Sequence, residues 1–426
     1  MKTILTACFA VVALAGVARA ADYQQLYSFC KDADCSDGAD PWSAPVGDGA
    51  GNYYGAAAGR DKNDGTIYSL SFDGTNWTYT TIYAFCVVDQ HCPDGKTPHG
   101  QLVLDTAGNL YGTTEYGGDN NRGVVFELSP RHGGWKYTRL YSFCVLSKCA
   151  DGENLTMDTL SYQGAQSGAL YDGTTPLFGA TTGDLTKTHG TVFSLTPARR
   201  SWKLKTLYTF CSEANCTDGD APYSGPIVDA AGNLFGVTVR GGAVNQGALY
   251  ELVRNGNSYD HQMVYDFCQQ ASCGDGSGPM AAPVMDGNGA LYGTAAAGGV
   301  GAGSHGQGTV YKLALKDGVW KFTKLHDFCD KSACSDGALP WGGVTLDTKG
   351  NIVGSAFLGG DANAGVLYKL AGRRQNNFTR LISLGGGSTP GGLPMSQPVQ
   401  ISPGTFIGTT ANGGGADQGV IYQLKP

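Results

Sequence analysis

The stretch DTAGNLYGTTEYGGDNNRGVVFELSP, residues Asp105–Pro130, decides the fold because the chain repeats it. Two clear copies are DAAGNLFGVTVRGGAVNQGALYEL at Asp229–Leu252 and DGNGALYGTAAAGGVGAGSHGQGTVYKL at Asp286–Leu313. Weaker copies surround Tyr54-Gly55, Phe178-Gly179, Val353-Gly354 and Ile407-Gly408, which makes seven copies in all. Self-similarity at a regular period is the sequence signature of a repeat architecture.

Each repeat contains four short segments with strand character. In the second repeat they are GQLVLD, NLYGTTEY, GVVFELS and WKYTRLYSF, separated by turns rich in glycine and asparagine, which tolerate positive φ. Four strands per repeat predict a β-propeller blade, whereas a sandwich does not need seven equal units and a β-helix has a much shorter period. We therefore predict an all-β fold, a single seven-bladed β-propeller over residues 21–426.

The order of the strands also predicts how the ring closes. YQQLYSF at Tyr23–Phe29 resembles the fourth strand of a repeat, and GVIYQL at Gly419–Leu424 resembles the third. Pairing these two segments would complete the last blade and hide two strand edges. We expect the N-terminal strand to close blade seven.

The motifs GNLYGTT, the Gly-Gly that follows and GVVFEL resemble the GloVer tandem repeat, which is found in exported and surface proteins of bacteria. The resemblance covers nearly the whole chain after residue 20. It implies an exported bacterial repeat protein with a propeller-like fold, and it implies no particular reaction. The chain departs from the plain repeat in its cysteine pairs and in its third unit, which has SYQGAQSGALYDGTTPLFG where the others have a short turn.

Residues 1–20 have the pattern of a secretory signal peptide. Lys2 precedes an apolar run, and Ala18-Arg19-Ala20 forms a cleavage site. A membrane anchor is the alternative, but the run is too short to span a bilayer. The net charge of the whole chain is −7 and becomes more negative without Lys2 and Arg19, which disfavours nucleic acid and anionic lipid as partners. We expect a secreted or periplasmic bacterial monomer with no membrane span.

Twelve of the 13 cysteines follow the signal and form six local pairs. The pairs are Cys30–Cys35, Cys86–Cys92, Cys144–Cys149, Cys211–Cys216, Cys268–Cys273 and Cys329–Cys334. The even number and the oxidising destination predict six disulfides, each worth about 2 kcal/mol by the chain-entropy argument. A zinc site is the alternative, but the spacing within the pairs is unlike that of zinc ligands. We expect no metal and no cofactor.

An Asp-Gly dipeptide follows each cysteine pair. The aspartates are Asp37, Asp94, Asp151, Asp218, Asp275 and Asp336. Six carboxylates on one face could collect cations, but Asp-Gly is also turn chemistry in which the carboxylate binds nearby backbone N–H groups. Because the dipeptide is identical in six repeats, we favour a structural role.

The residue five positions after each of these aspartates varies, and a proline usually precedes it. We call this set the ring residues: Trp42, His99, Thr156, Tyr223, Met280 and Trp341, with Met395 in the seventh repeat. They start the innermost strands, so in a propeller they surround the axis on one face, where the loops between the second and third strands also open. Those loops contribute Arg60, Arg122, His189, Arg240 and His305. We predict ligand binding by Trp42, His99, Tyr223, Met280, Trp341, Arg122, His189 and Arg240.

Three functions fit this pattern. The first is recognition of a glycan or another cell-surface polymer by exposed aromatic rings. The second is a polysaccharide lyase or hydrolase that uses His99, Tyr162 or His189 as acid or base, with Arg122 or Arg240 holding a carboxylate. In the third, the ring residues only plug the channel. We favour binding over catalysis because the chain has neither a G-x-S-x-G nor an H-E-x-x-H motif, and the question whether it is an enzyme stays open.

Overall fold

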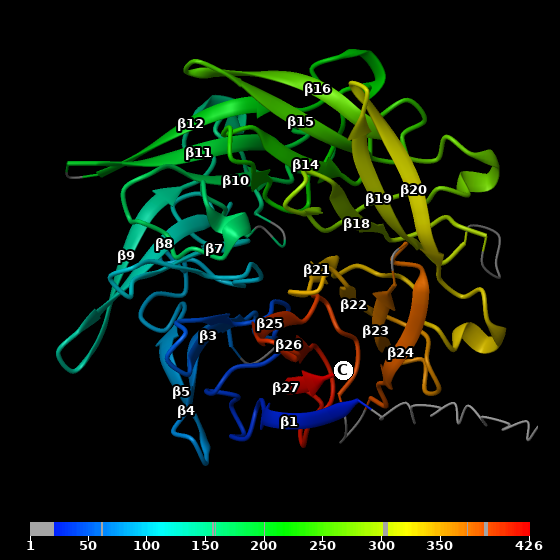
Figure 1. Cartoon of the computed structure of the whole chain (residues 1–426). Coiled ribbons are helices and arrows are strands. Elements are labelled where there is room, and N and C mark those ends of the chain that lie inside the picture. Colours follow the sequence, from blue (N-terminus) through cyan, green and yellow to red (C-terminus); the bar gives the residue numbers. More distant parts are fainter. Residues whose placement is uncertain are drawn as a thin grey trace, which may run out of the picture.

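The computed structural model describes residues 21–60, 63–155, 157, 159–199, 201–300, 306–372, 374–386 and 391–426. The predicted signal peptide, Thr156 and His305 lie outside these ranges. Seven antiparallel sheets surround a common axis (Figure 1), so the predicted seven-bladed propeller is confirmed.

The strands follow one another from the axis outward in each blade. Blade one has β2 (Val46–Gly47), β3 (Asn52–Ala57), β4 (Thr66–Phe72) and β5 (Trp77–Ala84), and blade two has β6 (Val103–Leu104), β7 (Leu110–Thr114), β8 (Val124–Arg131) and β9 (Gly134–Ser142). Blade three has β10 (Leu177–Thr181), β11 (Thr191–Ala198) and β12 (Ser201–Thr209), and blade four has β13 (Ile227–Val228), β14 (Leu234–Thr238), β15 (Ala248–Asn255) and β16 (Ser258–Asp266). Blade five has β17 (Val284–Met285), β18 (Leu291–Ala295), β19 (Thr309–Lys316) and β20 (Val319–Asp327). Blade six has β21 (Val344–Leu346), β22 (Ile352–Ala356), β23 (Val366–Ala371) and β24 (Asn377–Ser383).

Blade seven joins the two ends of the described chain. It contains β25 (Val399–Ser402), β26 (Thr405–Thr410) and β27 (Val420–Lys425), and β1 (Asp22–Ser28) is its outer strand. β1 runs antiparallel to β27, with Tyr23 opposite Leu424. The predicted closure of the ring by the N-terminal strand is therefore confirmed.

The glycine of the repeat motif has a packing reason. In blade four Gly236 of β14 lies opposite Tyr250 of β15, and a methyl group on Gly236 would overlap the Tyr250 hydroxyl. The tyrosine ring is fully buried and occupies the space that the missing side chain leaves. Aromatic rings of this kind fill the apolar layers between neighbouring blades, where most of the stabilising burial takes place.

Blade three is irregular, as its sequence suggests. It has three strands, and an isolated pairing of Ser161 with Phe178 stands where the other blades have an innermost strand. The segment that follows, here called the insertion (Tyr162–Leu170), contains the 3-10 helix η2 (Ala165–Ser167). Four more short 3-10 helices lie in the cysteine loops: η1 (Ser147–Cys149), η3 (Ala214–Cys216), η4 (Ala271–Cys273) and η5 (Ser332–Cys334).

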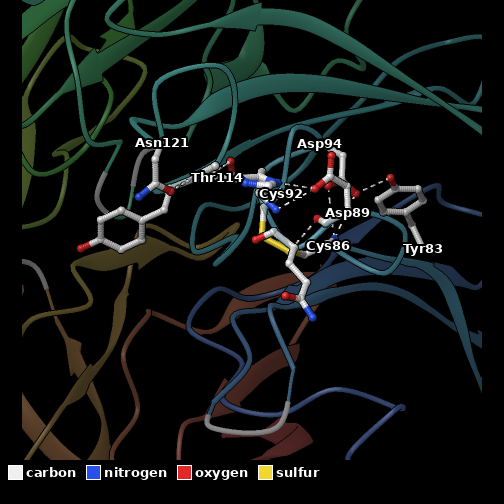
Figure 2. The surroundings of a disulfide bond; sticks show 11 residues. Tyr83, Cys86, Asp89, Cys92, Asp94, Thr114 and Asn121 are labelled. Atoms are coloured by element: carbon white, nitrogen blue, oxygen red, sulfur yellow. Dashed lines mark hydrogen bonds and ion pairs between the residues drawn. A yellow bond between two sulfur atoms is a disulfide. The ribbon is translucent and has the colours of Figure 1, made fainter.

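All six predicted cysteine pairs form disulfides within their own loops. Figure 2 shows the loop of Cys86 and Cys92. The Asp94 carboxylate accepts a hydrogen bond of 2.7 Å from the Tyr83 hydroxyl and another from the Cys86 N–H. Burial and this carboxylate together raise the pKa of Tyr83 well above its usual value. The repeated aspartate thus ties the cysteine loop to the outer strand.

One blade departs from this arrangement and gives a test of it. Tyrosines pair with the aspartate in five loops, but in the sixth loop His326 Nε2 lies 3.2 Å from Asp336 Oδ2. Both oxygens of the buried Asp336 carboxylate lack a well-aligned hydrogen bond among the described residues. A buried carboxylate without such bonds is destabilising.

We therefore expect His326→Tyr to raise the free energy of unfolding by about 1 kcal/mol, the net value of one hydrogen bond. Denaturant unfolding with the disulfides intact measures the change. The converse variant Tyr265→His, in the preceding loop, is the matched control and should lower stability by a similar amount. Lower stability of His326→Tyr would mean that the imidazole holds Asp336 better than a phenol does.

Candidate functional site

The residues two positions before the ring residues occupy equivalent backbone positions in the seven blades. The residue two positions before each ring residue has a φ between 53° and 59° and accepts a hydrogen bond of 2.8–3.2 Å from the first residue after the second strand of its own blade. The acceptors are Asp40, Thr97, Asn154, Ala221, Gly278, Leu339 and Leu393. The donors are Ala58, Glu115, Thr182, Val239, Ala296, Phe357 and Ala411. This bond sets the direction in which the chain enters the innermost part of every blade.

A cavity of about 640 Å³ runs along the axis between the innermost strands. Four ring residues line it: Trp42, His99, Met280 and Met395. Tyr223 and Trp341 do not line it, although both precede an innermost strand by a few residues in the same way. Whether these two contact a ligand stays a prediction, and it is limited to the rim of the cavity.

The donor residue distinguishes the two groups. In the blades whose ring residue lines the cavity, the donor of this hydrogen bond is alanine or glutamate. In the blades of Tyr223 and Trp341 the donor is larger: Val239 and Phe357 respectively. The rings of Trp341 and Phe357 stack with centroids 4.1 Å apart and an interplanar angle of 13°. Stacking on its own blade holds the Trp341 indole away from the axis.

Trp42 and His99, from neighbouring blades, form a stacked pair on the cavity wall. Their rings stack with centroids 3.9 Å apart and an interplanar angle of 6°. His99 Nδ1 lies 3.1 Å from Glu115 Oε2, and both side chains are largely buried. The buried indole N–H of Trp42 has no hydrogen-bond partner among the described residues. The wall therefore offers a flat apolar face and, behind it, an imidazole that lies beside a carboxylate.

Tyr116 extends this cluster toward the surface. Its pKa is raised to about 12 by partial burial and then by a hydrogen bond to Glu115 and the charge of that carboxylate, while Arg122 acts in the opposite direction. Tyr223 adds a smaller effect of the same sign as Glu115. The phenol thus stays protonated at neutral pH and donates to Glu115.

Sequence reasoning missed Glu115 and Tyr116. An alignment of the repeats could have found Glu115. It follows the LYGTT strand directly, at a position where three other repeats have alanine. A carboxylate at the position that faces a ring histidine is specific to the second repeat.

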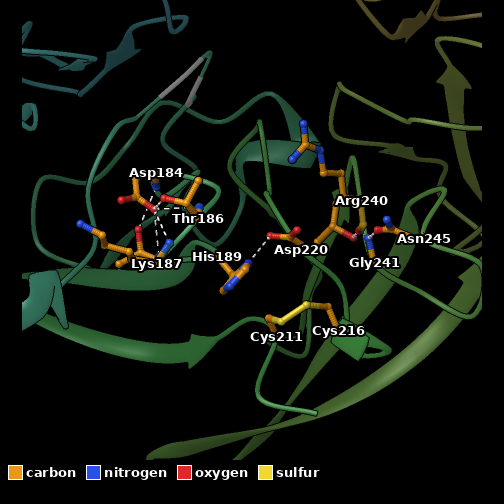
Figure 3. A network of polar contacts seen from close by, with 12 residues as sticks. Asp184, Thr186, Lys187, His189, Cys211, Cys216, Asp220, Arg240, Gly241 and Asn245 are labelled. Atoms are coloured by element: carbon orange, nitrogen blue, oxygen red, sulfur yellow. Dashed lines mark hydrogen bonds and ion pairs between the residues drawn. A yellow bond between two sulfur atoms is a disulfide. The ribbon is translucent and has the colours of Figure 1, made fainter. Parts of the chain in front are cut away.

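Two of the three basic residues predicted to bind a ligand form ion pairs with carboxylates of the protein itself. Arg122 Nε lies 3.1 Å from Glu153 Oε2, and His189 Nδ1 lies 3.0 Å from Asp220 Oδ1. Figure 3 shows His189 directed at Asp220, while the exposed Arg240 side chain extends away from that carboxylate. Of these three predicted ligand contacts, Arg240 alone has no ion pair within the described part of the chain. Ion pairs to the next blade favour a bracing role for Arg122 and His189.

Tyr162, considered above as an acid or base, lies at the opposite end of the cavity from the ring. Its hydroxyl donates a hydrogen bond of 2.6 Å to the Ala169 carbonyl and holds the insertion together. Burial raises its pKa. Tyr162 and His99 therefore do not form one acid–base pair, because the length of the innermost strands separates them.

Metal ligands come together in three places in the described ranges, and each includes a disulfide. The groups are His189 with Cys211 and Cys216, Asp64 with Cys86 and Cys92, and Glu153 with Cys144 and Cys149. Sulfurs bonded to each other are not thiolates, so they are not metal ligands in the oxidised protein. Within the same ranges, none of the helices has the length and apolarity needed to cross a bilayer.

Comparison with known proteins adds the repeat and the fold. The family model described as the Gloeobacter/Verrucomicrobia repeat matches residues 14–176 and 166–422. The solved structure of polysaccharide lyase Uly1 matches with a TM-score of 0.52 and 9% identity, over 92% of this chain and 90% of that one. A Dyadobacter fermentans protein of unknown function has a TM-score of 0.43 and 12% identity, over 96% of this chain and 98% of that one. No curated protein matches by sequence.

Proposed function

Since the chain belongs to the Gloeobacter/Verrucomicrobia repeat family, which is defined by a repeat and not by a reaction, we propose a function from the site: the protein is an exported recognition module that binds carbohydrate at the ring. The observation that carries the proposal is the stacked pair of Trp42 and His99 on the cavity wall. The propeller fold is also that of a polysaccharide lyase, although the low identity makes this a likeness of fold only.

The chemistry of the wall suits a sugar. A pyranose has an apolar face, which stacks on a flat aromatic ring, and a rim of hydroxyl groups, which need polar partners. The Trp42 indole provides the face, and polar side chains such as Gln101 and Gln397 line the same cavity. Specific small-molecule sites combine a mainly apolar lining with a few such polar groups.

Export is part of the proposal. Six disulfides are typical of proteins that work in an oxidising compartment, which supports a periplasmic or secreted location. Residues 1–20 would be the signal that directs the chain there. The negative net charge makes nucleic acid a poor partner.

A screen of neutral and uronic-acid polysaccharides tests the proposal directly. Each polymer is incubated with the oxidised protein, and both retention of the protein and release of shortened products are measured. We expect retention by at least one polymer and no product release. Absence of retention across the screen would refute carbohydrate binding.

Catalysis is the second candidate, and the His99–Glu115 contact favours it. Glu115 lies 3.1 Å from Nδ1 without a well-aligned hydrogen bond, and alignment of this contact on ligand binding would orient the imidazole and leave Nε2 for proton transfer. The cavity would bring a glycan to this nitrogen.

Two variants of this pair separate recognition from catalysis. We expect His99→Gln and Glu115→Gln each to weaken polysaccharide binding about tenfold, because each disturbs the wall on which Trp42 stacks. His132→Gln, on an exposed turn of blade two, is the control and should bind as the wild type does. If wild-type protein releases products and His99→Gln abolishes this release while binding is kept, the protein is an enzyme.

A further inference from the structure

The insertion of blade three lies at one end of the axial cavity. Ser161 and Tyr171 fix its two ends through isolated pairings with Phe178 and Asp105. Between them the chain leaves its own blade. The Gln163 amide donates a hydrogen bond of 3.1 Å to the Ala230 carbonyl of blade four, and the Met285 N–H of blade five donates one of 3.3 Å to Gln166 Oε1.

These contacts carry the insertion over the end of the channel along blades three, four and five. The insertion lines the cavity beside the ends of the innermost strands that lie far from the ring. Its lining residues are Ala165, Gln166 and residues 168–170. Blades three, four and five are thereby tied to one segment on this face. The insertion is therefore part of the cavity floor and not a loop on the outer surface.

The ring end is built differently. The residue two positions before each ring residue is held by a hydrogen bond within its own blade. No segment in the described ranges crosses from one blade to another over the axis at this end. The two ends of the cavity therefore differ, because one segment linked to three blades lies at the insertion end.

We infer that the ligand is the free end of a glycan chain, or a short oligosaccharide, which enters at the ring and stops at the insertion. This inference depends on the proposed carbohydrate function. The cavity volume of about 640 Å³ is that of a small-molecule site, which accommodates a few sugar units. The interior of a long polymer cannot enter a channel that is closed at one end, because both of its continuations need an exit.

The first experiment needs no ligand. In the shortened variant, three glycines replace Gln163–Gly168, a replacement that the contact between Tyr162 and Ala169 makes geometrically feasible. Hydroxyl-radical footprinting compares the labelling of Ile227 and Val284, which line the cavity near the insertion. We expect severalfold faster labelling in the variant and unchanged labelling of Met395 at the ring. Equal labelling of Ile227 and Val284 in both proteins would overturn the closed end.

A second variant guards against misfolding of the first. Gln166→Ala removes one tie to blade five and leaves the backbone of the insertion intact. Its labelling of Val284 should rise less than in the shortened variant but above the wild-type rate. Unchanged melting temperature shows that each variant is folded, and a wild-type rate in folded Gln166→Ala would speak against the closed end.

The second experiment counts chain ends. Polygalacturonate, alginate and xylan are used intact and after partial hydrolysis that shortens their chains tenfold. We expect about tenfold more protein bound per gram of the shortened polymer, because the number of ends rises tenfold. Equal binding per gram would show that internal segments are bound and would refute the inference. Failure to bind every probe would refute the proposed function instead, while footprinting still decides whether the channel is closed.

Discussion

Trp42→Ala is expected to weaken polysaccharide binding by about 1–3 kcal/mol, which is about 5- to 150-fold in Kd. The indole is the largest flat face on the cavity wall and stacks on His99, so its removal takes away both the contact surface and the support for the imidazole. Calorimetry with the polymer retained in the screen measures the change. The fold should be kept, because the disulfides and the buried apolar clusters of the strands are untouched.

Trp341→Ala is the matched control. Trp341 has the same backbone position in blade six, but it stacks on Phe357 and does not line the cavity. We expect its removal to change Kd less than threefold. Equal losses for the two variants would place the ligand on the rim and not in the cavity, and a loss confined to Trp341→Ala would contradict the assignment of the site.

Phe29→Ala is expected to lower the free energy of unfolding by about 3–5 kcal/mol, the cost of removing a large aromatic side chain from a packed core. Phe29 is fully buried and packs between Tyr68 of blade one and Ile407 and Ile421 of blade seven. Its N–H also donates to the Gly419 carbonyl at 3.0 Å. The substitution therefore weakens the contact between the first and the last blade.

Phe72→Ala provides the control, because Phe72 belongs to blade one but is 41% exposed. We expect it to cost less than about 1 kcal/mol. Denaturant unfolding under non-reducing conditions measures both variants. A loss for Phe29→Ala no greater than that for Phe72→Ala would mean that the seam between blades one and seven adds little to stability.

The number of blades, the strand order and the disulfides could be predicted from sequence because each depends on local, repeated signals. The glycine opposite Tyr250 and the aspartate bonded to Tyr83 recur at fixed positions, so one repeat explains the others. The path of the insertion could not be predicted. Its hydrogen bonds to Ala230 and Met285 join residues far apart in the chain, and no repeat precedes them as a guide.

The backbone positions of the ring segments were predictable, but the directions of their side chains were not. Spacing alone placed the ring residues, because the left-handed residue and its hydrogen bond recur in all seven blades. The direction of each side chain depends on its neighbour, so Trp341 turns to Phe357 while Trp42, beside Ala58, lines the cavity. The positive charge of Arg122 was visible in the sequence, but its pairing with Glu153 of the next blade was not.

β1 pairs with β27 across nearly the whole length of the chain, with Asp22 opposite Lys425. The strands of the other six blades follow one another directly, so those blades need only short loops to form. Contacts between residues distant in sequence form slowly, and we expect closure of the ring to be the last and rate-limiting step of folding. Until then the molecule is an open arc with two unpaired strand edges, the stage at which it is most exposed to aggregation.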